Sequence, residues 1–158
     1  KPFYMDEVYF KGHSRLFFLA EGDTSLIDEA LPLLAQEGVG TDRNVGHGYF
    51  EYKKEYLEIQ VPDSADMGLI LSTYIPDDKL QLEQTINNPH VAYELVRRGG
   101  WITSAPYNTL RKNAIYAFNA GSVLSGNPVG KIVDLAPKGL INHPVWRCGK
   151  TIVLPIKL

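Results

Sequence analysis

The sequence has one cysteine, no long hydrophobic run and almost no net charge, and each shortage excludes a class of protein. Because Cys148 stands alone among 158 residues, no disulfide can form within the chain. No stretch approaches the roughly 18 consecutive apolar residues of a membrane-spanning helix, and the opening residues lack the pattern of a signal peptide. The formal net charge of -2 predicts that any site for nucleic acid is a local patch. We therefore expect a cytoplasmic protein with no membrane partner.

The sequence also lacks the motifs that bind metal ions or nucleotides. The four histidines are scattered, and no group of cysteines and histidines has the spacing of a zinc site. Gly149-Lys150-Thr151 resembles the end of a P-loop, but Pro144 stands where that motif needs its first glycine. Aspartates in the predicted turns are typical of caps rather than of metal-assisted cleavage. We predict no metal, no cofactor and, for Cys148, a plain buried thiol.

Apolar residues make up 44% of the chain, which is enough for a globular domain with a hydrophobic core. Aromatic-rich and alternating patterns predict strands at residues 4–10, 16–20 and 49–61. Apolar residues at helical spacing predict a helix over residues 26–34, with capping oxygens before it and Gly38 as its stop.

The second half of the chain predicts a strand over residues 67–75 and a helical stretch over residues 76–86. Further strands are predicted at residues 93–102, 114–124, 131–135 and 151–156. The order β, α, β, β, α at the start is most of a ferredoxin-like unit. We therefore expect residues 1–158 to form a single α+β domain of ferredoxin-like fold, with an antiparallel sheet, helices on one face and additional C-terminal β-hairpins.

The sharpest signal for function is the glycine-rich segment over residues 38–48, which lies between a predicted helix and a predicted strand. Its four glycines carry no side chains, so backbone amides can approach a ligand that bears phosphate. Arg43 adds a forked cationic donor, and His47 can hydrogen-bond to or stack on a base. The candidate contact residues are Gly38, Gly40, Thr41, Asp42, Arg43, Asn44, Gly46, His47 and Gly48.

Other interpretations of this segment are a dinucleotide fingerprint and a ligand-free turn. The fingerprint needs a glycine where Arg43 stands, and it follows a strand rather than a helix, so it is excluded. The ligand-free turn stays open, because glycine motifs often match by accident.

The spacing Gly38-Val39-Gly40, five residues that include Arg43, and Gly46-His47-Gly48 resembles the glycine-rich loop of the RAMP superfamily. These are ferredoxin-like RNA-binding proteins of CRISPR systems. Two later segments are similar to the family of subunit 4 of the type III-A (Csm) complex. They are Arg98-Gly99-Gly100-Trp101-Ile102 and His143-Pro144-Val145-Trp146-Arg147-Cys148-Gly149-Lys150.

The resemblance implies a subunit with two ferredoxin-like halves, of which this chain would be the C-terminal half, with the N-terminal RAMP domain absent. It implies a protein without catalysis that binds the 5′ handle of the CRISPR RNA and caps one end of the backbone filament. The implied protein partners are the large polymerase-like subunit and the repeating backbone subunit of that complex.

Four basic residues in the middle of the chain complete the candidate RNA contacts: Arg97, Arg98, Arg111 and Lys112. A hairpin would bring the two pairs together as a basic patch that extends the RNA track or faces a neighbouring subunit. A solvated hairpin surface is the alternative interpretation. Trp101 and Trp146 are interpreted as buried or subunit-interface anchors rather than as base-stacking residues.

Two other functions stay open. A related branch of the RAMP superfamily processes CRISPR RNA, in some members with a histidine base, so a metal-independent endoribonuclease that uses His47 is the enzymatic alternative. Such cleavage would need a second acid or base near His47. A pure interaction module, whose loop docks a partner protein, is the third interpretation.

Overall fold

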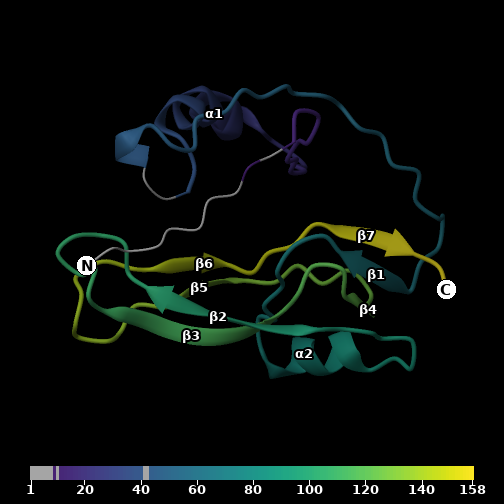
Figure 1. Cartoon of the computed structure of the whole chain (residues 1–158). Coiled ribbons are helices and arrows are strands. Elements are labelled where there is room, and N and C mark those ends of the chain that lie inside the picture. Colours follow the sequence, from purple (N-terminus) through teal and green to yellow (C-terminus); the bar gives the residue numbers. More distant parts are fainter. Residues whose placement is uncertain (1–8, 10, 41–42) are drawn as a thin grey trace. The chain divides into compact units, whose positions relative to one another are not determined.

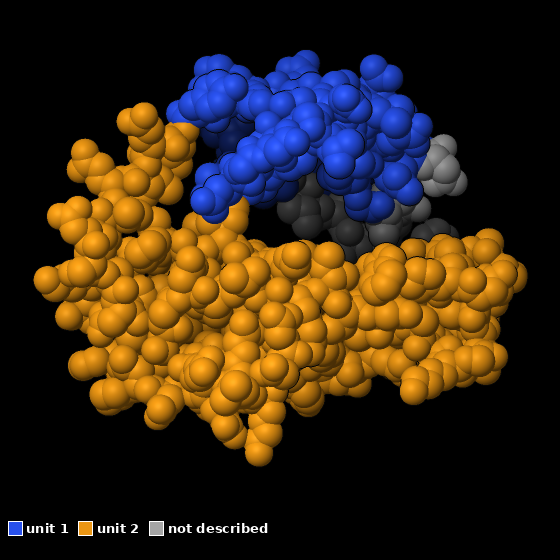
Figure 2. All heavy atoms as spheres, turned by 180° about the vertical axis from the view of Figure 1, so that it is seen from behind, with its two compact units in different colours: residues 1–56 blue, residues 57–158 orange. Residues whose placement is uncertain are grey.

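The computed structural model describes residues 9, 11–40 and 43–158. It divides into two compact units, residues 1–56 and residues 57–158, which Figure 2 colours blue and orange. The strand predicted over residues 4–10 lies, except for Tyr9, outside the described residues. Each unit is described by itself, so the single domain stays a prediction.

The first unit is built on helix α1, Ser25–Glu37. The carboxylate of Asp23 accepts a hydrogen bond from the backbone N–H of Ser25 at 2.9 Å, at the start of the helix. Gly38 ends the helix with a φ of 82° and donates its N–H to the carbonyl of Leu34 at 2.8 Å. The predicted helix and its glycine stop are therefore confirmed.

The strands predicted over residues 16–20 and 49–61 are wrong, because both segments are irregular in the structure. Phe17 and Tyr56 are 87% and 92% exposed. A strand needs a neighbour whose N–H and C=O groups face its own, and alternation of side chains supplies no such neighbour. Among the described residues, neither segment has a ladder partner.

The second unit contains an antiparallel three-stranded sheet in the order β4-β1-β7. Its strands are β1, Met67–Ile70; β4, Val123–Ser125; and β7, Val153–Ile156. Helix α2, Lys79–Ile86, begins where the carboxylate of Asp78 accepts a hydrogen bond from the N–H of Gln81 at 2.8 Å. The helical stretch after Pro76 is confirmed, while the strand predicted over residues 67–75 ends early at Ile70.

Two antiparallel strand pairs extend from this sheet toward the other end of the unit (Figure 1). They are β2, Leu95–Trp101, with β3, Arg111–Phe118, and β5, Ile132–Asp134, with β6, Trp146–Cys148. The strand predicted over residues 114–124 is split into β3 and β4 by a turn, and β6 was not predicted. The α+β class with antiparallel sheets is confirmed.

The core of the second unit is formed by Ile70, Tyr74, Phe118 and Leu124. Tyr74 is fully buried, and its hydroxyl lies 3.2 Å from Thr85 Oγ1 and donates to Gln81 Oε1 at 3.1 Å. These bonds attach α2 to the strands, and burial raises the pKa of Tyr74. Among the described residues, no helix has the length and hydrophobicity to cross a membrane.

Candidate nucleic-acid interface

Glycines close the neck of the loop over residues 38–48. Val39 donates its N–H to the carbonyl of Gly48 at 2.9 Å, which joins the two ends of the loop. A Cβ on Gly48 would lie 2.0 Å from the carbonyl oxygen of Val39, and one on Gly38 would lie 2.8 Å from that of His47. Both glycines have φ above 80°, so only glycine fits the neck without strain.

The outer part of the loop is open. A short 3-10 turn, Arg43–Val45, is closed by a hydrogen bond from the N–H of Gly46 to the carbonyl of Arg43 at 3.1 Å. Gly40 and Gly46 both have φ of 93°, and a Cβ on Gly40 would meet no atom within 4 Å. The backbone there is accessible to a ligand. Thr41, Asp42 and the side chain of Asn44 lie outside what the structure describes.

Arg43 and His47 are both exposed at this loop. Neither side chain makes a hydrogen bond or ion pair with another described residue. Arg15 differs, because its guanidinium donates to the carbonyls of Gly12 and Ser14. The described residues therefore give Arg43 no ion-pair partner and give His47 no hydrogen-bonded acid or base.

Lys54 connects the segment after the loop to the start of the helix before it. Its ammonium lies 2.9 and 2.7 Å from the two carboxylate oxygens of Asp28 and 3.2 Å from the hydroxyl of Thr24. The hydrogen bond from Lys54 lowers the pKa of Asp28, and the same bond raises the pKa of Lys54. Two contacts therefore hold the loop: the hydrogen bond between Val39 and Gly48 at its neck, and the ion pair between Lys54 and Asp28 outside it.

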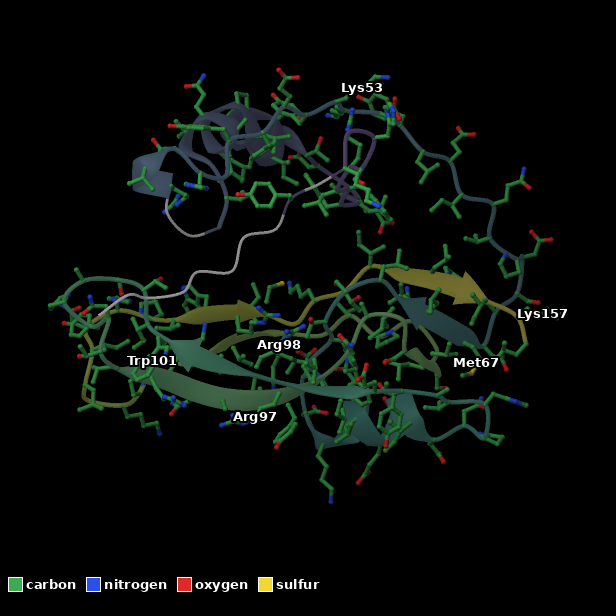
Figure 3. All side chains as sticks on the ribbon, in the orientation of Figure 1. Lys53, Met67, Arg97, Arg98, Trp101 and Lys157 are labelled. Atoms are coloured by element: carbon green, nitrogen blue, oxygen red, sulfur yellow. The ribbon has the colours of Figure 1, made fainter. Side chains whose placement is uncertain are left out.

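The strand pair β2–β3 brings the predicted basic residues together and separates each pair by face. Arg97 lies opposite Tyr116, and Arg98 lies opposite Ile115. Figure 3 shows Arg97 and Arg98 pointing to opposite sides of β2. Arg97 is exposed, whereas Arg98 is half-buried, and its Nε has no hydrogen-bond partner among the described residues.

Arg111 and Lys112 are divided in the same way. Arg111 lies opposite Trp101 and is exposed, while Lys112 lies opposite Gly100 and is half-buried. The hairpin interpretation is confirmed, and its use by RNA stays a prediction.

Charge is strongly segregated along the chain, which the near-zero total conceals. Residues 95–158 contain nine lysines and arginines and one acidic residue, Asp134, a formal charge of +8. Residues 1–94 contain seven basic and seventeen acidic residues, a formal charge of -10. Counting charge by segment would have found this cationic half from sequence.

The ion pairs of the described residues all lie in the acidic half of the sequence. They are Lys53–Glu55, Lys54–Asp28 and Lys79–Glu83. The arginines and lysines of β2, β3 and β6 therefore have no carboxylate partner among the described residues, and their charge favours an external polyanion.

Three other predicted residues lie at the surface. Cys148 is exposed, so its interpretation as a buried thiol is wrong. Trp101 and Trp146 are 54% and 66% exposed, so neither is a buried anchor, and their role at a subunit interface stays a prediction. No group of three or more metal-ligating side chains occurs in the described part of the chain.

Fold and site together define an α+β protein with an open glycine loop and cationic strand pairs. The chain belongs to the Csm4 family, because the family "CRISPR Csm4 C-terminal domain" matches residues 63–156. The resemblance to subunit 4 is thus confirmed. The match contains the cationic strand pairs, and the glycine loop precedes it.

Curated relatives agree with this family. The chain is 30% identical over 160 residues to "CRISPR system Cms protein Csm4" of Mycobacterium tuberculosis (strain CDC 1551 / Oshkosh), covering 98% of this chain and 51% of that protein. It is 29% identical over 134 residues to the protein of that name from Streptococcus thermophilus, covering 81% of this chain and 44% of the relative. The chain thus spans about half the length of the relatives it matches.

Proposed function

We propose that this chain is a non-catalytic part of a type III CRISPR interference complex and holds the guide RNA on the loop over residues 38–48. The supporting observation is the geometry of that loop. The glycine neck closes it, while Gly40 and Arg43 are both exposed. Exposed backbone N–H groups in a turn, beside one arginine, are a common means of holding phosphate.

The cationic strand pairs of the second unit supply further proposed RNA contacts. Single-stranded nucleic acid binds grooves and faces of positive charge, and its affinity depends on the number of phosphates contacted. Arg97 and Arg111 are exposed and offer guanidinium groups for such contacts, and the half-buried Arg98 and Lys112 add a guanidinium and an ammonium group.

The names of the relatives and the resemblance support a place for this chain in a wider assembly. The bound segment would be the 5′ handle of the CRISPR RNA, in a ferredoxin-like protein that caps one end of the filament in the cytoplasm. The large polymerase-like subunit and the first repeating backbone subunit would be its neighbours.

The test is binding of labelled guide RNA to the purified full-length protein by fluorescence anisotropy at several salt concentrations. We expect Arg43→Ala to weaken binding similarly for unrelated RNA sequences. It should also lower the slope of log affinity against log salt by about 0.7, the value for one phosphate contact on a single strand. Arg15→Ala is the matched control, because that exposed arginine already bonds to its own turn.

The same mixtures separate the other functions. An unchanged salt slope in Arg43→Ala would contradict the proposed role of the loop. Cleavage of the RNA without metal, abolished by His47→Ala, would instead support the endoribonuclease. If the protein neither binds nor cleaves the RNA, the interaction module is the interpretation that remains.

A further inference from the structure

Trp101 and Arg111 form an exposed aromatic–cation pair at the end of the strand pair β2–β3. They lie directly opposite each other in the ladder, so their side chains share one face of the pair. The guanidinium carbon of Arg111 lies 4.6 Å from the centre of the Trp101 ring. Trp101 is nevertheless 54% exposed, so Arg111 covers one face of the indole and leaves much of the ring accessible.

The loop that joins the two strands holds this pair in place. Ile102, the residue after Trp101, is buried and donates its N–H to the carbonyl of Leu110 at 2.9 Å. The hydroxyl of Ser104 lies 2.8 Å from Nε2 of His143, and the rings of Tyr107 and His143 are in edge contact at 5.6 Å. Attachment to the turn at His143 limits the motion of the loop, so little ordering is required when a ligand binds.

The charge around the pair selects the kind of ligand. No aspartate or glutamate occurs between Glu94 and Asp134, so the whole of β2, β3 and their loop lacks acidic residues. The guanidinium of Arg111 has no ion-pair partner among the described residues. A ligand that combines a flat ring with negative charge would satisfy both members of the pair, and an unpaired nucleotide has both properties.

We propose that Trp101, with Arg111 behind it, is a stacking platform for one unpaired base of single-stranded RNA. This inference rests on the proposed RNA-binding function and names a contact of its own, separate from the glycine loop. Stacking on an indole accepts any base, so the platform contributes affinity without reading sequence. Arg111 also attracts the adjoining phosphate.

A second position of the same strand pair repeats the combination of residues. Arg97 lies opposite Tyr116, and Tyr116 is 65% exposed. Trp101 remains the stronger platform, because its ring is larger and the guanidinium of Arg111 lies over it.

The experiment follows tryptophan emission while a single-stranded RNA of about ten nucleotides is added to the full-length protein. Stacking should quench the emission of Trp101. We expect the quenching to disappear in Trp101→Leu and to persist in Trp146→Phe, which changes the other exposed tryptophan. Affinity should fall about tenfold in Trp101→Leu with an unchanged salt slope, because stacking contributes no ionic contact.

An RNA with abasic positions separates stacking from structural damage. The intact protein should bind it as weakly as Trp101→Leu binds normal RNA, and circular dichroism should show the variant folded. RNA binding that neither quenches Trp101 nor weakens in Trp101→Leu would overturn the platform and leave the proposed function standing. Absence of all RNA binding would overturn both. A change in Trp101 emission caused only by a protein subunit of the complex would reassign this surface to protein contact.

Discussion

Val39 and Gly48 touch backbone to backbone, and this contact closes the glycine-rich loop. The N–H of Val39 donates to the carbonyl of Gly48 at 2.9 Å, and the Cα of Gly48 faces the carbonyl of Val39 so closely that no Cβ fits between them. The four glycines of the loop therefore have two roles. Gly38 and Gly48 allow the neck to close, while Gly40 and Gly46 keep the exposed backbone open with positive φ.

Gly48→Ala should open the neck, because its Cβ would lie 2.0 Å from a backbone oxygen. We expect guide-RNA affinity to fall by more than tenfold, measured by anisotropy. Gly40→Ala is the matched control, since it has a positive φ but free space around its Cβ. In Gly40→Ala the free energy of unfolding should fall by the backbone strain alone, roughly 1–2 kcal/mol. Equal losses in the two variants would contradict the role of the neck.

The contact between Lys54 and Asp28 should depend on pH. Hydrogen bonding to Lys54 lowers the pKa of Asp28, so its stabilising effect is present above about pH 4, the ordinary carboxyl value. It is lost as the pH falls through the lowered pKa. Melting temperatures of the protein and of Asp28→Asn should therefore differ at neutral pH and converge in acid. Glu29→Gln, an exposed neighbour on α1, should show no such convergence.

Tyr74→Phe should destabilise the second unit by about 1–3 kcal/mol, because the buried hydroxyl of Thr85 loses a partner. Urea unfolding would measure the loss. Adding Thr85→Val should recover part of it, since replacing both members of a buried hydrogen bond costs less than removing one. Additive losses would show that the two hydroxyls do not interact.

Tyr74 should also make stability fall at alkaline pH. Burial raises its pKa, so the folded state holds the phenol proton after the unfolded chain releases it at about pH 10. Stability is fully present below that value and declines as the pH rises toward the raised pKa. The decline should be smaller in Tyr74→Phe than in the unchanged protein, measured by unfolding at pH 8 and at about pH 10.5.

Arg97→Ala should lower the salt slope of RNA binding by about 0.7, as expected for one phosphate contact. Lys79→Ala should not, because Lys79 lies on α2 and pairs with Glu83 at 3.5 Å in the acidic half of the sequence. An equal effect of both substitutions would indicate that RNA affinity depends only on the net charge of the protein. The exposed side of β2 would then not be an RNA-binding surface.

Local patterns predicted the two helices well, because each depends on interactions within one segment. Apolar spacing and Gly38 indicated α1, and the helical stretch predicted over residues 76–86 contains α2. Residues 49–61 have the alternation of a strand without a neighbour to pair with, so the same kind of reasoning was wrong there. A strand is decided by a distant partner, which a single segment does not contain.

The sequence by itself determined the glycine spacing, the positions of the cations and their separation from the acidic half. Only the tertiary structure decided that Gly38 and Gly48 meet at a neck, that Arg97 and Arg98 face opposite ways, and that Trp101 lies exposed against Arg111. The physical reason is that residue identity fixes charge and conformational freedom locally. Strand register and burial depend on contacts between residues far apart in the chain.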